Sequence, residues 1–309
     1  MGRRMEVKQK ILITGGAGTV GKAFINKYYN DYEFYSISRN ETHIADLKKE
    51  FPNVTCFIGD ICDLDHMINL FSGIRPDIVI HAAALKHINL AEENPTKAVE
   101  INVVGSLNII KASVRAEVPL TVGISTDKAC NPDSVYGYSK RMMETMFMQY
   151  HNDKTKFVCT RFANVANSNG SVIPFWISEA EKGNALKLTD PRMNRLMFSK
   201  KESAELIKYA IDASDYNFPF VLCKKMKNVN LLELAKLLSD KEVEIIGKRP
   251  GEKLNETLIS KKELPYTMQE NGYILIVSEA GDEGILTEEH SSENAEWMTE
   301  KEMRELVWN

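Results

Sequence analysis

The first 165 residues alternate short apolar runs with longer helical patterns, and this alternation limits the folds open to the chain. Six runs are rich in Ile and Val and do not alternate apolar with polar residues: KILITG, EFYSIS, VTCFIGD, DIVIHAA, LTVGIST and KFVCTRF. Such runs are typical of strands buried on both faces. Between them lie helical patterns, including one from Pro95 to Ala116. Strands alternating with helices indicate an α/β fold, with a doubly wound parallel sheet of Rossmann type over residues 1–165.

Residues 166–309 lack this rhythm, and we expect them to form a smaller C-terminal lobe with segments that return to the sheet. Ser199 is in N-cap position before one helical pattern, and Thr299 and Glu302 have capping-box spacing before another. The expected helices are IPFWISEAEKGN, SKKESAELIKYAIDA, VNLLELAKLLSD and MTEKEMRELV, and the expected strands are FPFVLC, EVEIIG and YILIVS. The polar stretch EAGDEGILTEEHSSENAE is expected to be a loop.

Composition and charge exclude several classes of function. The net charge is −4 over 309 residues, which disfavours binding to nucleic acid or to an anionic membrane. No segment approaches the ~20 apolar residues of a membrane span. The six histidines show no metal-binding spacing, so we expect no metal. Five dispersed cysteines without C-x-x-C favour reduced thiols and a cytoplasmic location.

A glycine motif follows the first apolar run. ILITGGAGTVG places Gly15, Gly18 and Gly21 after a strand and before a helix, with Thr19 and Val20 between the last two glycines. Glycines let the backbone approach a pyrophosphate, and the N-terminus of the helix offers free N–H groups. These five residues are therefore predicted to bind a dinucleotide. The alternative is a tight strand-to-helix turn without a ligand.

The spacing G-x-x-G-x-x-G resembles that of the extended short-chain dehydrogenase/reductase superfamily. The resemblance implies that Asp60 and Ile61, in GDICD, contact adenine. Near the end of the second run, SISRNE has Ser38 and Arg39 where an NAD site usually has an acidic residue. Arg39 suits a 2′-phosphate, so the sequence favours NADP over NAD. A solvated loop arginine is the alternative.

A Tyr-x-x-x-Lys pattern follows the fifth run. Tyr136 and Lys140 share one face if a helix begins near Val135. A nearby ammonium is expected to lower the pKa of the phenol, so that Tyr136 can take a proton from an alcohol as hydride leaves its carbon. Thr126, at the end of the fifth run, can hydrogen-bond the same oxygen. The alternative is an ordinary surface pair.

Asp127 and Lys128 form a second acid–base pair. A ketone acidifies the adjacent C–H, so an amine can remove that proton while a carboxylic acid protonates a neighbouring hydroxyl, and water is lost. Lys128 would need a lowered pKa, which burial and nearby cations favour; Asp127 would need to be protonated. Adjacent strand residues point opposite ways, so both face one site only if the strand ends here, which ACNPD favours. The alternative is a surface ion pair.

The motifs together resemble the UDP-N-acetylglucosamine 4,6-dehydratases, in the polysaccharide-biosynthesis group of extended short-chain dehydrogenases. STDKACNPDSVYGYSK is similar to the family pattern S-T-D-K-A-x-x-P followed by Y-G-x-[ST]-K. Further similar segments are HAAALKHINLAEENPTKAVEINVVGS, TDPRMNRLMFS and RPGEKLNE. RFANVANSNGSVIP also matches, with Ala163 and Asn167 where the family usually has glycine.

The resemblance implies a reaction and a role for each catalytic residue. Thr126, Tyr136 and Lys140 would run hydride transfer at sugar C4. Lys128 would abstract the C5 proton, and Asp127 would assist departure of the C6 hydroxyl. Hydride then returns to C6, so NADP would be tightly bound and recycled. Glucose-type dehydratases have Glu at the position of Lys128, so this residue favours the acetamido sugar.

The resemblance also implies binding residues and an assembly. The cofactor would further contact Ala82, Ala83, Ala84 and Asn102. The substrate-binding lobe and its surroundings would contribute Lys86, Asn164, Ser171, Val172, Ile173, Pro174, Thr189, Arg195, Arg249 and Glu252. Arg249 would pair with the diphosphate and Glu252 with ribose hydroxyls, although a solvated turn is the alternative. By analogy with the superfamily, we expect a homo-oligomer.

Two other functions stay open from the sequence. A UDP-sugar 4-epimerase would need Tyr136 and Lys140 but has no use for a proton-transferring pair at C5 and C6. A non-catalytic NADP-binding sensor would need neither system, and such proteins commonly lose the Tyr or the Lys.

Overall fold

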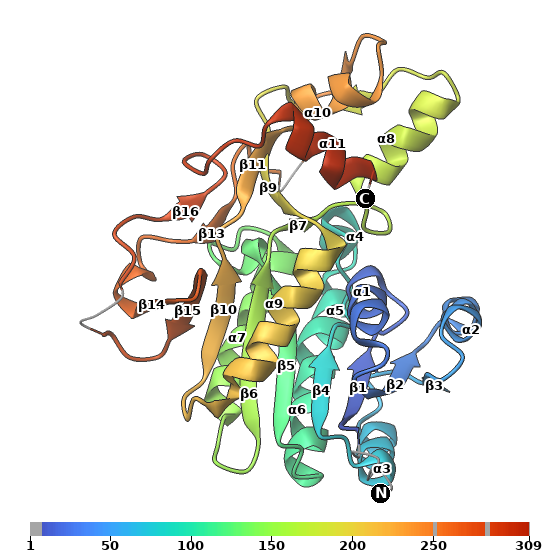
Figure 1. Ribbon diagram of the computed structural model, residues 1–309, viewed down its shortest axis with the longest axis vertical. Helices are drawn as coiled ribbons and strands as arrows, with labels where there is room; N and C mark the ends of the chain where they lie inside the picture. The colour runs from blue at the N-terminus through green and yellow to red at the C-terminus, as the bar shows by residue number, and fades with distance from the viewer. Residues whose placement is uncertain (1–7, 250–251, 282–284, 309) are drawn as a thin grey trace, which may run out of the picture.

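Figure 1 shows the computed structural model, which describes residues 8–249, 252–281 and 285–308. Pro250 and Gly251 of the RPGEKLNE motif lie outside the described residues, as do residues 282–284 of the expected polar loop.

The centre of the molecule is a nine-stranded sheet in the order β14-β15-β10-β6-β5-β4-β1-β2-β3. Strands β1 to β6 are parallel to their neighbours. They match the six apolar runs: β1 (Lys10–Thr14), β2 (Glu33–Ser38), β3 (Thr55–Ile58), β4 (Ile78–His81), β5 (Leu120–Thr126) and β6 (Lys156–Phe162). The reversal of strand order beside β1 is the doubly wound arrangement predicted from the sequence, and it is confirmed.

Segments from the C-terminal half extend this sheet. β10 (Phe220–Lys224) pairs parallel with β6, and β15 (Tyr273–Val277) pairs antiparallel with β10. These are the expected strands FPFVLC and YILIVS. β14 (Thr267–Glu270) forms the outer edge and pairs antiparallel with β15.

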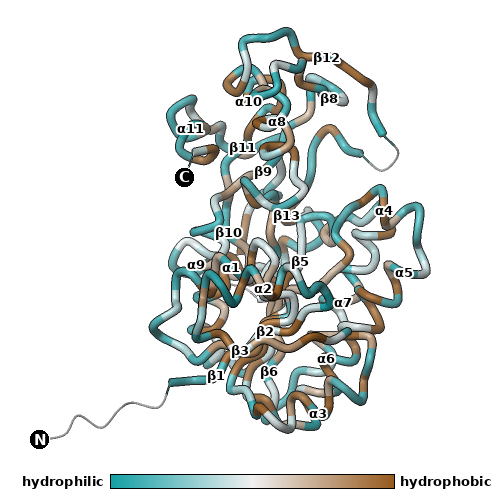
Figure 2. The backbone as a smooth tube through the Cα atoms, turned by 90° about the vertical axis from the view of Figure 1, so that its right-hand side faces the viewer, coloured by the Kyte–Doolittle hydropathy of each residue, from teal (hydrophilic) through white to brown (hydrophobic). Residues whose placement is uncertain are grey.

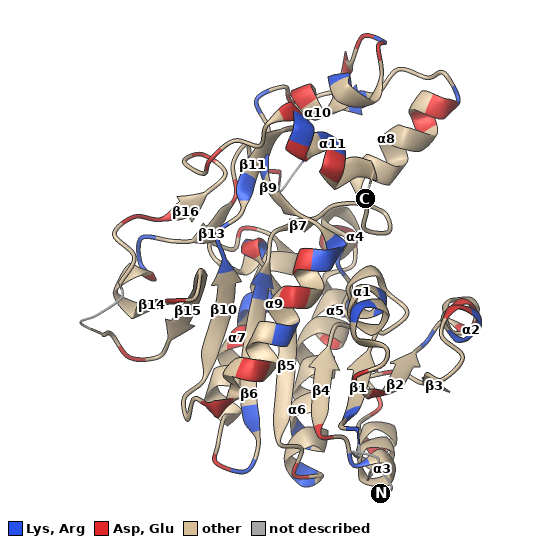
Figure 3. Ribbon diagram, in the orientation of Figure 1, with Lys and Arg blue, Asp and Glu red and all other residues tan. Residues whose placement is uncertain are grey.

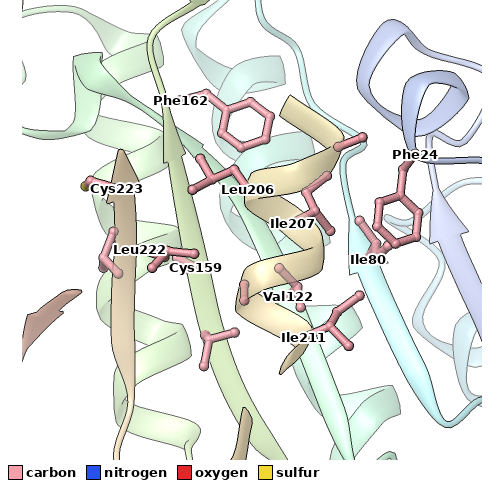
Figure 4. Close-up of a cluster of buried hydrophobic side chains, with 14 of the residues drawn as sticks. Phe24, Ile80, Val122, Cys159, Phe162, Leu206, Ile207, Ile211, Leu222 and Cys223 are labelled. Atoms are coloured by element: carbon pink, nitrogen blue, oxygen red, sulfur yellow. The ribbon is translucent and has the colours of Figure 1, made fainter. Parts of the chain in front are cut away.

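Helices cover both faces of the sheet. α1 (Thr19–Tyr28) and α9 (Lys200–Asp212) lie on one face, and α3 (Leu64–Ile74), α6 (Gly105–Arg115) and α7 (Val135–Tyr150) lie on the other (Figures 1 and 2). Apolar side chains of α9 meet those of the strands and of α1 in the main core (Figure 4). Two further helices of this half are α2 (Glu41–Glu50) and α4 (Ile88–Glu93).

The expected helix from Pro95 to Ala116 is continuous but not uniform. It consists of α5 (Pro95–Val99), a π-helix η1 (Glu100–Val104) and then α6. One widened turn therefore interrupts an α-helical pattern, as happens frequently at functional sites.

The smaller lobe lies beyond the C-terminal ends of the central strands (Figure 1). Its sheets are β11-β9-β7, β12-β8 and β13-β16. Their strands are β7 (Asn164–Val165), β8 (Lys187–Leu188), β9 (Asn194–Phe198), β11 (Lys227–Asn230), β12 (Glu244–Ile245), β13 (Thr257–Ile259) and β16 (His290–Ser291). The helices are α8 (Val172–Glu181), α10 (Leu231–Leu238) and α11 (Glu300–Trp308).

The lobe has its own core, and its helix ends follow the sequence signals. Trp176 is fully buried among apolar residues of α8, α10 and α11. Ser199 and Glu202 form the reciprocal capping box of α9. Thr299 and Glu302 exchange the same bonds at α11, which confirms that prediction. Charged residues recur along α9 and α11, whereas β4 and β5 contain no Lys, Arg, Asp or Glu (Figure 3).

Candidate active site

β5 ends at Thr126, and this ending decides the geometry of the next two residues. Asp127 to Ala129 form a short 3-10 helix, η2, so the strict alternation of a strand no longer applies. Asp127 and Lys128 consequently face the same pocket, and Lys128 Nζ lies 3.1 Å from Asp127 Oδ1. Thr126 Oγ1 donates to that same oxygen at 2.8 Å. The expectation that the strand ends in time for both residues is confirmed.

This pocket has an empty volume of about 330 Å³ and is rich in charged and polar groups. Its walls come from η2, from the loop before α7, from α4 and from the segment that leads into β13. The lining residues are Ile88, Asp127, Lys128, Asn131, Asp133, Ser134, Lys253, Glu256 and Thr257. A site at the C-terminal end of a parallel strand, beside a second lobe, is where ligands bind in this class of sheet.

Glu256 is a member of this cluster that the sequence analysis missed. Its Oε2 accepts a hydrogen bond from Lys128 Nζ at 2.8 Å, and its Oε1 lies 3.4 Å from Arg195 Nε. Glu256 is the last residue of RPGEKLNE, so the family motif already included it. Nothing in the neighbouring sequence indicated that its partner is Lys128, 128 residues away.

The charges of the pocket perturb one another strongly. Burial raises the pKa of Asp127, and the nearby Glu256 carboxylate raises it further, to about 7. Burial alone would also raise the pKa of Glu256, but the Lys128 and Arg195 cations outweigh burial and hold it below its usual range. At neutral pH Asp127 therefore titrates while Glu256 stays ionised.

The expected lowering of the Lys128 pKa is wrong for the protein alone. Burial does lower the pKa of this amine, but Asp127 and Glu256 outweigh burial and raise it above its usual value. Burial and nearby cations could be expected from the sequence, whereas the second carboxylate, Glu256, is brought to Lys128 only by the fold.

Tyr136 and Lys140 lie on α7, which begins at Val135 as expected. Ser134 caps the helix by accepting from Gly137 N, and Glu92 Oε1 accepts from Val135 N at 2.7 Å. Gly137 allows close contact with η2, because a Cβ there would lie 2.5 Å from Lys128 O. The helix therefore holds Tyr136 directly beside the acid–base pair.

The pKa values of these two residues follow from burial. Burial raises the pKa of Tyr136 to about 12, although the Lys128 ammonium opposes this rise. The expected lowering of the phenol pKa is thus wrong for the protein alone, because burial outweighs the cation. Burial lowers the pKa of Lys140 to about 8, and its Nζ donates to Met143 Sδ at 3.2 Å.

A buried ion network lies behind the pocket. Arg161, at the end of β6, is fully buried and donates two hydrogen bonds to Glu144 of α7, at 2.8 and 2.9 Å. The same guanidinium bonds both oxygens of Glu263, at 2.9 and 3.1 Å. Arg161 thereby connects α7 to the segment that follows β13.

The glycine turn fits a dinucleotide. Gly15 has φ +71°, and a Cβ there would lie 3.0 Å from backbone atoms of Ala83. A Cβ at Gly21 would lie 2.6 Å from Gly16 Cα. Gly18 is the N-cap of α1 and supplies no side chain, so the first N–H groups of α1, from Thr19 and Val20 onward, are available to a phosphate.

The adenosine end of the predicted site contains Arg39 and Asp60. Arg39 follows Ser38 at the end of β2, and its Nη1 lies 3.5 Å from Asp60 Oδ2. Ile61, the next residue, is buried. The structure thus brings together the residues selected for this end of the cofactor.

Asn102 lies in the π-helix η1 and connects two walls of the site. Its side chain exchanges hydrogen bonds with the backbone of Leu85 and donates to Ser139 Oγ at 2.9 Å. It therefore fixes the loop after β4, which begins at Ala82, Ala83 and Ala84, against α7.

Several predicted substrate residues lie where β7 leads into α8. Asn164 Nδ2 donates to Leu196 O at 3.1 Å. Ser171 is the N-cap of α8, and its buried hydroxyl has no hydrogen-bond partner among the described residues. Val172, Ile173 and Pro174 form the first turn of α8.

Lys86 reaches across to the loop before α8. Its Nζ donates to Asn169 O at 2.5 Å, and Asn169 N donates to Thr19 Oγ1 at 2.9 Å. This loop consequently bridges the start of α1 and the loop after β4.

Two other substrate residues lie apart from the pocket. Thr189 bonds Met193 Sδ, and neither Thr189 nor Arg249 lines the pocket. Arg249 is exposed, and its backbone N–H donates to Glu252 Oε2 at 3.0 Å. Arg195, predicted to bind substrate, lies against Glu256 and donates to Lys253 O.

The two departures from the family glycines are accommodated. Asn167 has φ +54°, the left-handed region that glycine adopts easily and asparagine tolerates. Its amide donates to Val307 O at 2.7 Å, near the end of α11. The loop therefore keeps a glycine-like backbone at this position and gains an anchor. Ala163 is buried.

Among the described residues, no helix is both long and apolar enough to cross a membrane. Within the same ranges, no cluster of His, Cys, Asp or Glu side chains could hold a metal ion.

The profile of the polysaccharide biosynthesis protein family matches residues 11–278, which include the glycine turn, the acid–base pair and Glu256. The chain belongs to this family. Membership, together with the first relative described below, confirms the resemblance inferred from the motifs.

Two relatives that align with nearly the whole chain are named for different activities. A UDP-N-acetylglucosamine 4,6-dehydratase (inverting) from Campylobacter jejuni is 32% identical, over 97% of this chain and 97% of the relative. A UDP-glucose 4-epimerase from Rickettsia massiliae is 31% identical, over 98% of this chain and 96% of the relative. The X-ray structure of Pen from Bacillus thuringiensis has a TM-score of 0.91 and 27% identity, with 98% of both chains covered. Both named relatives act on nucleotide sugars, and the choice of reaction depends on the site.

Proposed function

We propose that the protein is an NADP-dependent UDP-N-acetylglucosamine 4,6-dehydratase that forms a UDP-2-acetamido-2,6-dideoxy-4-hexulose. The observation that carries this proposal is the pairing of Asp127 with Lys128 in a pocket beside Tyr136. A reaction limited to C4 leaves this second acid–base system without a role.

Tyr136 would act first, as the base that takes the proton of the C4 hydroxyl. Its pKa of about 12 in the protein alone means that phenolate formation has to be coupled to hydride departure from C4. Lys140 and Thr126 would support the developing charge. A bound nicotinamide would supply the hydride acceptor at C4 and later the hydride donor at C6.

Lys128 and Asp127 would then remove water across C5 and C6. The pKa of about 7 gives Asp127 a substantial protonated fraction near neutral pH, as a general acid for the C6 hydroxyl requires. Lys128 is charged in the protein alone and must release a proton before it can accept the one from C5. Because Asp127 loses its proton at lower pH than Lys128, the active form with neutral Lys128 and protonated Asp127 is a minor one, and the rate should rise with pH up to the pKa of Asp127 and level off above it.

NADP is our proposed cofactor because Arg39 stands where NAD sites carry an acid. The 2′-phosphate would compete with Asp60 for this guanidinium and gain charge-assisted hydrogen bonds. Release of the bound cofactor by denaturation, followed by mass spectrometry, tests this choice. NAD in place of NADP would contradict it.

We further propose three features of the whole enzyme. Residues 1–165 would bind NADP and carry the catalytic groups, and residues 166–309 would mainly bind the UDP-sugar. The enzyme would work in the cytoplasm, in agreement with five free cysteines. It would form a homo-oligomer through apolar side chains exposed on α4, α5, η1 and α7: Leu90, Val99, Val104, Tyr138 and Met142.

The decisive test is incubation of the protein with UDP-N-acetylglucosamine in deuterated water. Dehydration predicts a product that has lost one water, with deuterium at C5. A UDP-sugar 4-epimerase, which the Rickettsia relative supports, would return an isomer of unchanged composition with inverted C4. Cofactor binding without turnover of any UDP-sugar would instead support a non-catalytic sensor.

A further inference from the structure

Glu256 enters the active site from the C-terminal half of the chain. It immediately precedes β13, which lies against η2, and its side chain is only 9% exposed. The backbone N–H of Glu256 donates to Ser292 Oγ at 2.9 Å, which fixes the position of the carboxylate. A buried carboxylate held in this way toward an ammonium group is an element of the site rather than of the surface.

Lys128 lies between two carboxylates. Its Nζ is 3.1 Å from Asp127 Oδ1 and 2.8 Å from Glu256 Oε2. Glu256 has a second cation, because Arg195 Nε lies 3.4 Å from its other oxygen. Asp127 shares Lys128 and forms no ion pair with a second cation among the described residues, and its side chain is fully buried.

The unequal number of cations decides which carboxyl group holds a proton. Two carboxylates that share one ammonium repel each other, and the group with less compensation protonates first. Asp127 Oδ2 is buried and makes no hydrogen bond to the described residues. Protonation of this oxygen therefore breaks no existing hydrogen bond.

We propose that Glu256 is a positioning residue that keeps Asp127 protonated by charge repulsion and orients Lys128 through its Oε2. This inference rests on the proposed dehydratase function for its purpose, since only dehydration uses Asp127 as an acid. A residue of the C-terminal half thereby keeps the general acid of the N-terminal half in its protonated form.

The groups around Asp127 come from several elements. Thr126 of β5 and Lys128 of η2 contact Oδ1, and Tyr136 of α7 is a close neighbour. Arg195 of β9 acts on the cluster through Glu256. At the rim of the pocket, Lys253 pairs with Asp133 at 3.2 Å, which largely neutralises both charges.

The test variant is Glu256→Gln, which keeps an oxygen for Lys128 and removes the charge. Without the repelling carboxylate, the pKa of Asp127 falls. The pH at which the rise of kcat for dehydration levels off should move at least one unit lower, with KM little changed. Glu256→Asp retains the charge and should keep this pH near its original value.

A matched control is Glu205→Gln, which removes another Lys–Glu pair, Lys27 with Glu205 between α1 and α9. It should leave the pH profile unchanged. A rise of kcat that levels off at the original pH in Glu256→Gln would overturn the proposal.

A readout without substrate separates this inference from the proposed function. Infrared titration of the wild type should show a protonated carboxyl band that disappears near pH 7 and is absent in Asp127→Asn. In Glu256→Gln the band should disappear at lower pH. If these bands behave as stated and UDP-N-acetylglucosamine is not dehydrated, the proposed function fails and the role of Glu256 stands. A wild type without an Asp127 band at pH 6 would overturn the inference.

Discussion

Lys128 carries an ammonium group held by two carboxylates, and its removal should affect one half of the reaction. Lys128→Ala should lower the dehydration rate by about 10²- to 10⁴-fold, because a general base is lost. Cofactor binding and C4 oxidation should persist, so that reduced cofactor accumulates on addition of UDP-N-acetylglucosamine. The absorbance of reduced nicotinamide and the mass of the product measure the two halves.

Loss of the ammonium also leaves two buried carboxylates without a shared cation, which costs stability. Lys128→Gln retains a hydrogen-bond donor and serves as a second variant. Lys154→Ala, which removes an exposed Lys–Glu pair, is the control and should be fully active. Collapse of cofactor occupancy in Lys128→Gln would show that Lys128 has another role.

His81 provides a test of stability against pH. It is buried at the end of β4, with Nδ1 2.8 Å from Thr14 Oγ1 and Nε2 2.9 Å from Ser106 Oγ. Burial lowers its pKa to about 3, and the charge of Lys140 acts in the same direction. The unfolded chain binds this proton more tightly, so the stability from neutral His81 is present above about pH 6.5 and is lost as pH falls toward 3.

His81→Gln should remove this pH dependence. Urea unfolding at several pH values between 4 and 7.5 should show a stability loss for the wild type on acidification, on the order of a few kcal/mol. The variant should lose less over the same range. Equal slopes for both proteins would show that His81 is not responsible.

At the level of elements, the packing of α7 on η2 depends on Gly137. A Cβ at this position would lie 2.5 Å from Lys128 O, a backbone atom that cannot move alone. Gly137→Ala should destabilise the protein by about 1–3 kcal/mol and reduce kcat, because the helix that carries Tyr136 has to shift. Thermal unfolding and steady-state kinetics measure both effects.

Gly73→Ala is the matched control. Gly73 lies within α3, and an added Cβ there would meet no atom within 4 Å. This substitution should stabilise the protein by about 0.5–1 kcal/mol through helix propensity. Full activity in Gly137→Ala would show that α7 tolerates the shift.

The sequence predicts the elements whose signal is local. The apolar runs of β1 to β6 and the capping boxes at Ser199 and Thr299 needed no knowledge of distant contacts. The hairpin β14–β15 also has a local signal, the Asn-Gly pair between its strands. Asn271 and Gly272 both have positive φ between the two strands, as Asn-Gly turns do.

The remaining features depend on three-dimensional arrangement. A π-turn at Glu100–Val104 adds one residue to a turn, which the spacing of apolar residues does not reveal. Glu256 meets Lys128 across 128 residues of chain, so no window of sequence contains both. The pKa directions of Tyr136 and Lys128 were wrong because each is a difference between burial and charges that only the folded chain positions.

For the whole molecule, the candidate pocket joins both halves of the chain. β5, η2 and α7 supply the residues proposed to transfer protons, and the segments 192–197 and 253–257 supply Arg195 and Glu256. Arg161 connects α7 with Glu263 behind this pocket. A shift of the C-terminal lobe would therefore change the contact between Glu256 and Lys128, and with it the charge around Asp127.

The homo-oligomer proposal concerns one face of the molecule. α4, α5 and α7 pack beside one another there, and Val104 and Met142 are 43% and 50% exposed. A second copy would cover these apolar side chains.

A charged residue placed in such an interface has to be desolvated without a partner, so Val104→Glu with Met142→Glu should weaken assembly by about 100-fold or more. Light scattering after size exclusion should then report the monomer mass. Phe175→Glu, an exposed apolar residue on α8, is the control and should leave the mass of the assembly unchanged. An unaltered oligomer in the double variant, or a monomeric wild type, would contradict the proposal.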